Sequence, residues 1–99
     1  MLNVTKNASD NALTVALEGR LDTVTAPQLE SELAGELEGV DRVVFDFEKL
    51  EYISSAGLRV LLSTQKKMMT RGEMKVVNVG DAVMEILEVT GFCDFLSIG

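Results

Sequence analysis

The stretch EYISSAGLRVLL, residues 51–62, leads from aromatic and apolar residues through two serines and a glycine into an amphipathic run. The apolar residues that follow recur at helical spacing, which predicts a helix from Ala56 to about Thr70. Ser54 and Ser55 stand at its entrance. A helix leaves its first amides unpaired, so these amides can receive either a serine oxygen or a phosphate group. From the pattern alone the serines are either a helix cap or a site of chemistry.

The segments on either side of this stretch alternate between strand and helix patterns. The chain opens with two β-branched, alternating runs joined by the turn-forming SDNA, which predicts a hairpin whose second strand ends at Gly19. Amphipathic helical patterns and short runs rich in Val and Phe follow. The expected strands are 2–8, 12–19, 41–47, 73–79 and 92–98, with a connection at 48–52, and the expected helices are 26–38, 56–70 and 82–91.

Particular residues mark where these helices should begin and end. Thr25 and Gln28 have the spacing of a capping box at the start of the first helix. Asp81 suits the N-cap of the last helix. Gly72 and Gly91 occupy the preferred C-terminal positions of the second and third helices.

The order of elements predicts the fold class. The 99 residues suit one domain, residues 1–99. Strands that alternate with helices after an initial hairpin indicate an α/β (mixed α+β) fold. We therefore expect a four- to five-stranded mixed sheet covered by helices.

Composition excludes several classes of function. Sixteen acidic and nine basic residues give a net charge of −7, which counts against nucleic acid and favours partners with basic patches. The chain has no histidine, and Cys93 is its one cysteine, which excludes histidine-based acid/base catalysis and zinc sites. We also expect no other metal and no cofactor. No secretory signal and no apolar run of about 20 residues is present, so we expect a cytoplasmic protein without membrane insertion.

Four blocks of the sequence occur together in a familiar order: LEGRLD at 17–22, VVFDFEKLEYISSAGLRVLL at 43–62, RGEMKVVNV at 71–79 and VMEILEVTGF at 83–92. With them the chain resembles the sulfate transporter and anti-sigma factor antagonist (STAS) domain family, in its small stand-alone bacterial form. The second block is the most specific, because an apolar strand, an acidic turn and the serine entrance follow one another. The resemblance implies a STAS-like fold.

The resemblance also implies a phosphorylation site. In the family, an Asp, a phosphorylatable Ser, a second hydroxyl residue and a Gly follow one another at this entrance. With Gly57 as the anchor, the phosphoacceptor falls on Ser55, and Ser54 is the second choice. Ser54 stands where the family has its Asp, and Ala56 where it has the second hydroxyl residue.

The function implied by the resemblance is that of an anti-sigma factor antagonist. The unmodified protein binds an anti-sigma factor with serine kinase activity, phosphorylation ends the binding, and a phosphatase restores it. This chain has neither a Gly-rich phosphate loop nor a kinase catalytic signature, so we expect a binding module and not an enzyme. The expected partner-binding residues are Asp22, Thr23, Ser54, Ser55, Gly57, Leu58 and Arg59.

Two of these residues keep alternative interpretations. The family residue that matches Asp22 lies beside the phosphorylated serine, but an Asp here can also cap its turn through Thr23 or Thr25. Leu58 and Arg59 are expected on the exposed first turn of the helix. There Arg59 either contacts an acidic group of the partner or is simply solvated.

A second function is compatible with the same domain. It could be a non-phosphorylated STAS subunit of a lipid-transport ABC complex, or another protein-interaction scaffold, whose helix entrance binds an ATPase subunit permanently. The absence of the family Asp before Ser55 favours this alternative. The sequence does not specify the sigma factor, the kinase or the oligomeric state.

Overall fold

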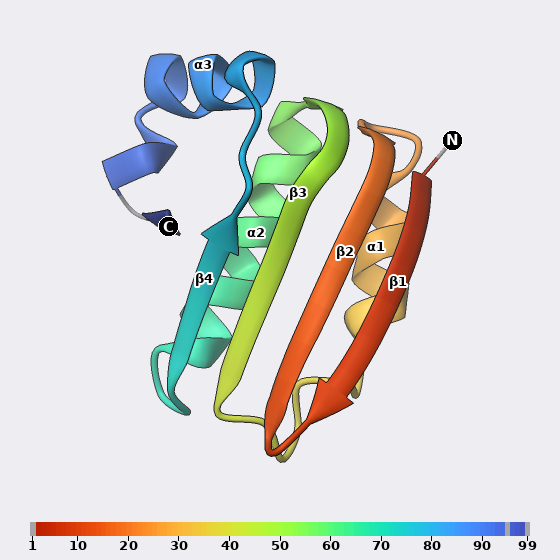
Figure 1. Cartoon of the computed structure of the whole chain (residues 1–99), viewed down its shortest axis with the longest axis vertical. Coiled ribbons are helices and arrows are strands. Elements are labelled where there is room, and N and C mark those ends of the chain that lie inside the picture. The colour runs from red at the N-terminus through yellow and green to blue at the C-terminus, as the bar shows by residue number, and fades with distance from the viewer. Residues whose placement is uncertain (1, 95, 99) are drawn as a thin grey trace.

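A computed structural model shows a five-stranded mixed sheet with three helices (Figure 1). The structure describes residues 2–94 and 96–98. The strand order is β1-β2-β3-β4-β5; β1 and β2 are antiparallel, and the other neighbours are parallel. The expected fold class is confirmed. The elements are β1 (Leu2–Ser9), β2 (Ala12–Leu21), α1 (Ala26–Leu33), β3 (Arg42–Ile53), α2 (Ser55–Met68), β4 (Glu73–Val77), α3 (Asp81–Thr90), a 3₁₀ turn (Phe92–Asp94) and β5 (Ser97–Ile98).

The hairpin at the start of the chain forms as expected. Ser9 pairs with Ala12, and the two residues between them, Asp10 and Asn11, have φ of 50° and 66°. Two consecutive residues with positive φ are the signature of the tight turn that matches the twist of antiparallel strands, and Asp and Asn tolerate that conformation.

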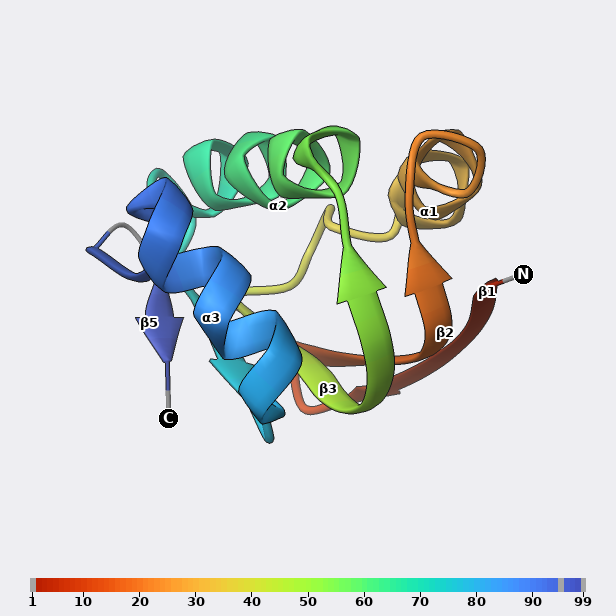
Figure 2. The same ribbon diagram turned by 90° about the horizontal axis from the view of Figure 1, so that it is seen from above.

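The helices cover one face of the sheet and leave much of the other open. Figure 2 shows α1 and α2 side by side on the same face, while α3 contacts β3 and the 3₁₀ turn. Along β2, Leu13, Val15 and Leu17 are buried under the helices, whereas Thr14 and Glu18 are exposed. The alternation of the strand sequence therefore separates a core face from a polar face.

β3 is longer than the sequence analysis expected, because residues 48–52 continue the strand instead of forming a connection. Its pairing with β2 shifts register twice, between Ala16 and Glu18 and between Gly19 and Arg20, and each shift leaves one extra residue on β3. Gly19 has a φ of 107° at the second shift, so it lies inside β2 and does not end it.

The first helix is shorter than expected and starts differently. α1 ends at Leu33 and not at residue 38, and Gly35 and Gly39 follow with φ of 79° and 82°. The expected capping box is absent. The Thr25 side chain makes no cap hydrogen bond, and Gln28 Nε2 donates to the carbonyl of Leu2 at 2.9 Å.

The remaining helix ends also differ in detail. Gly72 is not in a left-handed conformation; a Cβ there would collide with the backbone of Asp41, so this glycine allows close approach of two chain segments. The N-cap of α3 is Gly80, and Asp81 is the first residue of the helix. Gly91 ends α3 with a φ of 80°, as expected. The expected last strand, 92–98, is reduced to β5 after a 3₁₀ turn, and its residue 95 lies outside the described residues.

The head of α2 is held against the end of β2. Leu21 pairs with Ile53 in the parallel ladder, and the amide of Ser54 donates to the carbonyl of Leu21 at 2.8 Å. A Cβ on Gly57 would lie 2.6 Å from Leu21 Cγ and 3.0 Å from Ile53 Cγ1. The missing side chain of Gly57 therefore lets the first turn of α2 rest directly on the strand ends.

This close contact predicts the effect of Gly57→Ala. Alanine favours helix by about 1 kcal/mol over glycine, so on propensity alone the substitution should stabilise the protein. Because the new methyl group collides with Leu21 and Ile53, we expect the free energy of unfolding in denaturant to fall instead, by about 1–2 kcal/mol. Gly80→Ala is the comparison without a collision, since no atom lies within 4 Å of its Cβ position; because Gly80 is the N-cap of α3, where alanine is less favourable than glycine, we expect a loss of about 0.5–1 kcal/mol. A Gly57→Ala protein as stable as the parent contradicts the packing described.

Candidate functional site

The two serines at the head of α2 have different roles in the structure. Ser54 is the N-cap, and its Oγ accepts a hydrogen bond from the amide of Gly57 at 3.4 Å. Ser55 is the first residue of the helix and is exposed, and its hydroxyl has no hydrogen bond to another described residue. The capping role therefore falls to Ser54, and the hydroxyl of Ser55 is accessible for chemistry.

The turn after β2 is built around Asp22. Asp22 Oδ1 accepts from the amides of Val24 and Thr25, both at 3.0 Å. The Thr25 hydroxyl accepts from the amide of Asp22 and donates to the carbonyl of Arg20, each at 2.8 Å. These bonds fix the turn, and they support the interpretation of Asp22 as a cap that acts through Thr25.

The same hydrogen bonds set the charge state of Asp22. The pKa of Asp22 is lowered from its ordinary value, chiefly by the hydrogen bond from the Thr25 amide. The Val24 amide, the Thr25 hydroxyl and the charge of Arg20 lower this pKa further, whereas desolvation raises it. Arg20 lies near this carboxylate, with Nε 3.9 Å from Oδ2, and its guanidinium stands 4.5 Å from the centre of the Tyr52 ring.

A shallow groove runs between α1 and α2, and its lining begins at Ala56, the residue that follows the two serines. Its volume is about 350 Å³. The α1 side is lined by Thr23, Pro27 and Glu30, and the α2 side includes Ala56 and Arg59. Thr23 and Arg59, both expected in the partner-binding surface, therefore line one groove.

Two residues expected in that surface are buried. Leu58 is 3% exposed, so the expectation that it lies on the exposed first turn is wrong; its side chain packs inward with the core. Gly57 is also buried, against Leu21 and Ile53. Neither residue is available for direct contact with a partner through its side chain.

The sequence analysis missed one exposed apolar side chain at this end of the molecule. Val24 is 84% exposed, in the turn that Asp22 fixes. The available signal was a single apolar residue among the polar residues between β2 and α1. Because the backbone of the turn is hydrogen-bonded, Val24 is presented in a defined position beside Thr23.

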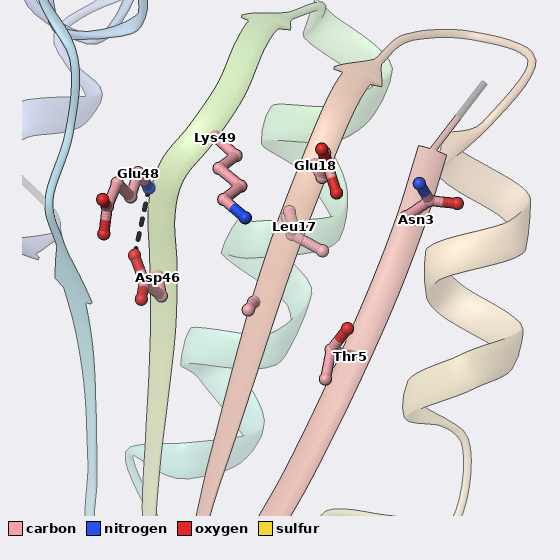
Figure 3. A pocket seen from close by; sticks show the side chains of 8 residues that line it. Asn3, Thr5, Leu17, Glu18, Asp46, Glu48 and Lys49 are labelled. Carbon is pink, nitrogen blue, oxygen red and sulfur yellow. Dashed lines mark hydrogen bonds between the residues drawn. The ribbon is translucent and has the colours of Figure 1, made fainter.

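A second hollow lies on the open face of the sheet, away from the serines (Figure 3). Its volume is about 220 Å³, and Asn3, Glu18, Glu48 and Lys49 are among its lining residues. Asp46 at its edge accepts hydrogen bonds from the amide of Glu48 at 3.0 Å and from Asn78 Nδ2 at 3.1 Å. Asp46 thereby links β3 to Asn78, just after the end of β4, which gives this side chain a structural role.

The described residues offer neither a cluster of metal ligands nor a membrane-spanning helix. Within residues 2–94 and 96–98, no three side chains of His, Cys, Asp or Glu gather in a way that could hold a metal ion. None of the helices in these ranges has the length and apolar character needed to cross a bilayer.

The chain is similar to known proteins along almost its whole length. The family model of the STAS domain matches residues 3–99. The chain belongs to the STAS domain family. The Bordetella bronchiseptica protein BtrV, which is provisionally named an anti-sigma factor antagonist, is 36% identical to this chain. The match covers 98% of this chain and 85% of BtrV.

Solved structures show the same fold. An anti-sigma factor antagonist from Mycobacterium paratuberculosis superposes with a TM-score of 0.89 at 25% identity, over 99% of this chain and 85% of that one. The Bacillus cell fate determinant SpoIIAA in its phosphorylated form superposes with a TM-score of 0.75 at 15% identity, over 98% of this chain and 91% of that one. At this identity the likeness shows the fold alone. The family and the non-enzymatic regulatory class expected from the sequence are confirmed.

The lowered pKa of Asp22 predicts a pH dependence of stability. A carboxyl whose pKa is lower in the folded than in the unfolded protein stabilises the fold above its ordinary pKa, here 3.8, and this contribution is lost as the pH falls through the folded-state pKa. Asp22→Asn keeps an acceptor oxygen but does not titrate. We expect the parent to lose stability relative to Asp22→Asn as the pH falls below about 4, measured by urea unfolding. A difference between the two proteins that stays constant from pH 7 to pH 3 contradicts this role.

Proposed function

We propose that this protein is an anti-sigma factor antagonist controlled by phosphorylation of Ser55. Unmodified, it binds an anti-sigma factor with serine kinase activity through the surface that contains Ser55, Thr23 and the groove between α1 and α2. Phosphorylation of Ser55 separates the two proteins, and a phosphatase restores binding. The proposed compartment is the cytoplasm.

The observation that supports this proposal most is the exposed hydroxyl of Ser55. It stands on the first residue of α2, while its neighbour Ser54 supplies the helix cap. Modification of Ser55 therefore leaves the cap in place. The relative from Bordetella bronchiseptica is named as an anti-sigma factor antagonist, which supports an anti-sigma factor as the partner; its serine kinase activity is part of the proposal.

The proposed reaction is a phosphoryl transfer in which the partner supplies ATP and the catalytic groups. Ser55 Oγ bonds to the γ-phosphorus of ATP, the bond from that phosphorus to the bridging oxygen breaks, the hydroxyl proton passes to a base of the kinase, and ADP leaves. The role of this chain is to present the hydroxyl on a rigid helix end.

Release follows from the added charge. A phosphate contributes roughly −1.5 to −2 at neutral pH, and the chain already carries −7. A partner surface that fits the neutral hydroxyl must then accommodate a solvated dianion, at a cost in repulsion and desolvation. The change is confined to the end of α2 and requires no refolding of the sheet.

The test uses three substitutions and one identified partner. The protein that copurifies with the chain from its own cells is purified and assayed with labelled ATP for phosphorylation of Ser55. We expect Ser55→Ala to bind this partner as the parent does but to accept no label, and Ser55→Asp to bind it at least about 10-fold more weakly. Ser9→Asp is the charge-matched control and should bind normally, because Ser9 is exposed and pairs with the start of β2, at the opposite end of that strand from the head of α2.

Other outcomes favour the scaffold alternative. The antagonist proposal is wrong if three results occur together: a transporter ATPase copurifies with the chain, Ser55 carries no phosphate, and Ser55→Asp leaves the complex intact. Absence of phosphoryl transfer to Ser55 by the copurified partner contradicts it equally.

A further inference from the structure

Ser55 and Arg59 are exposed residues one helical turn apart on α2. Residues four apart on a helix are neighbours on the same face, with Cβ atoms about 5–6 Å apart. Arg59 makes no ion pair with another described residue, and it lines the groove between α1 and α2. An uncommitted cation therefore lies within reach of the hydroxyl that we propose is phosphorylated.

We propose that Arg59 is the internal counter-charge of phosphorylated Ser55. Its guanidinium binds the phosphate along the surface of α2 and is thereby withdrawn from the groove between α1 and α2. This inference rests on the proposed function, in which Ser55 receives the phosphate.

The chemistry of the two groups suits this pairing. The planar guanidinium presents parallel N–H donors that match two oxygens of a phosphate, which a lysine ammonium cannot do. The anion precedes the cation by four residues, which is the favourable order on a helix. The backbone of α2 holds both residues already, so little additional ordering is needed.

The other charged groups at this end compete only weakly. Arg20 is the other nearby cation, but it stands over the Tyr52 ring and next to Asp22. Glu30 lines the α1 side of the groove and can attract Arg59, but no ion pair forms between them. A phosphate dianion carries more charge than this carboxylate and lies on the same helix face as Arg59.

The pairing gives phosphorylation two effects on the partner surface. The groove loses a free cation that an acidic group of the partner can contact, and an anion appears at its end. The partner that we infer presents an apolar surface with an acidic group facing Arg59. Both the loss of the free cation and the new anion reduce the fit of this chain to that partner.

The test is a measurement on the isolated chain and needs neither kinase nor partner. Phosphoserine is incorporated at residue 55 during synthesis of the full chain, and the second pKa of its phosphate is measured by ³¹P NMR titration. We expect this pKa to be lower by about 0.3 in the parent than in Arg59→Gln, because the cation favours the dianion. Lys66→Gln, an exposed cation in the last turn of α2, is the control and should leave the phosphate pKa unchanged.

Equal phosphate pKa values in the parent and Arg59→Gln overturn the inference. A difference that survives 1 M salt also contradicts it, since an exposed ion pair is screened there. Circular dichroism of each variant checks that α2 is intact. These results are independent of the binding experiment: loss of the Arg59 effect leaves phosphorylation-controlled release standing, whereas a Ser55→Asp protein that keeps its partner removes the proposed function itself.

Discussion

The site depends on the contact between the first turn of α2 and the end of β2. The parallel pair Leu21 and Ile53 brings two strand ends together, the amide of Ser54 donates to the carbonyl of Leu21, and Gly57 has no side chain to hold the helix away. This contact fixes where α2 begins and which of its residues face solvent. Ser55 points outward because the inner side of the turn is occupied by Gly57 and the buried Leu58.

Around that contact, structural and chemical roles are divided between neighbouring residues. Ser54 caps the helix, and Asp22 fixes the adjacent turn with hydrogen bonds that also lower its pKa. Ser55 and Arg59 take no part in these bonds, so their surface chemistry can change without loss of the fold. This division suits the proposed switch, in which a change of charge at one helix end alters binding without altering the fold.

The sequence predicts the parts of this arrangement that are set locally. The order of strands and helices, the hairpin turn and the serine pair at the helix entrance all follow from short patterns. One part that it missed is local: the Thr25 hydroxyl bonds within the turn, to Asp22 and Arg20, and not in a capping box. Two other parts depend on contacts between distant segments. Gly19 has the pattern of a strand end but lies at a register shift between β2 and β3, and Leu58 is buried where the first turn of α2 packs on Leu21 and Ile53. Figure 1 shows these distant segments meeting at one end of the sheet.

The claim that the switch is local is tested most directly by ¹H–¹⁵N correlation spectra of the full chain with serine and with phosphoserine at residue 55. The account predicts that amide shifts change in residues 22–25 and 54–59, while those of β1, β4 and the centre of β3 keep their positions. Shift changes spread across β4 and α3 would show that the phosphate rearranges the whole fold, and that result would contradict the account.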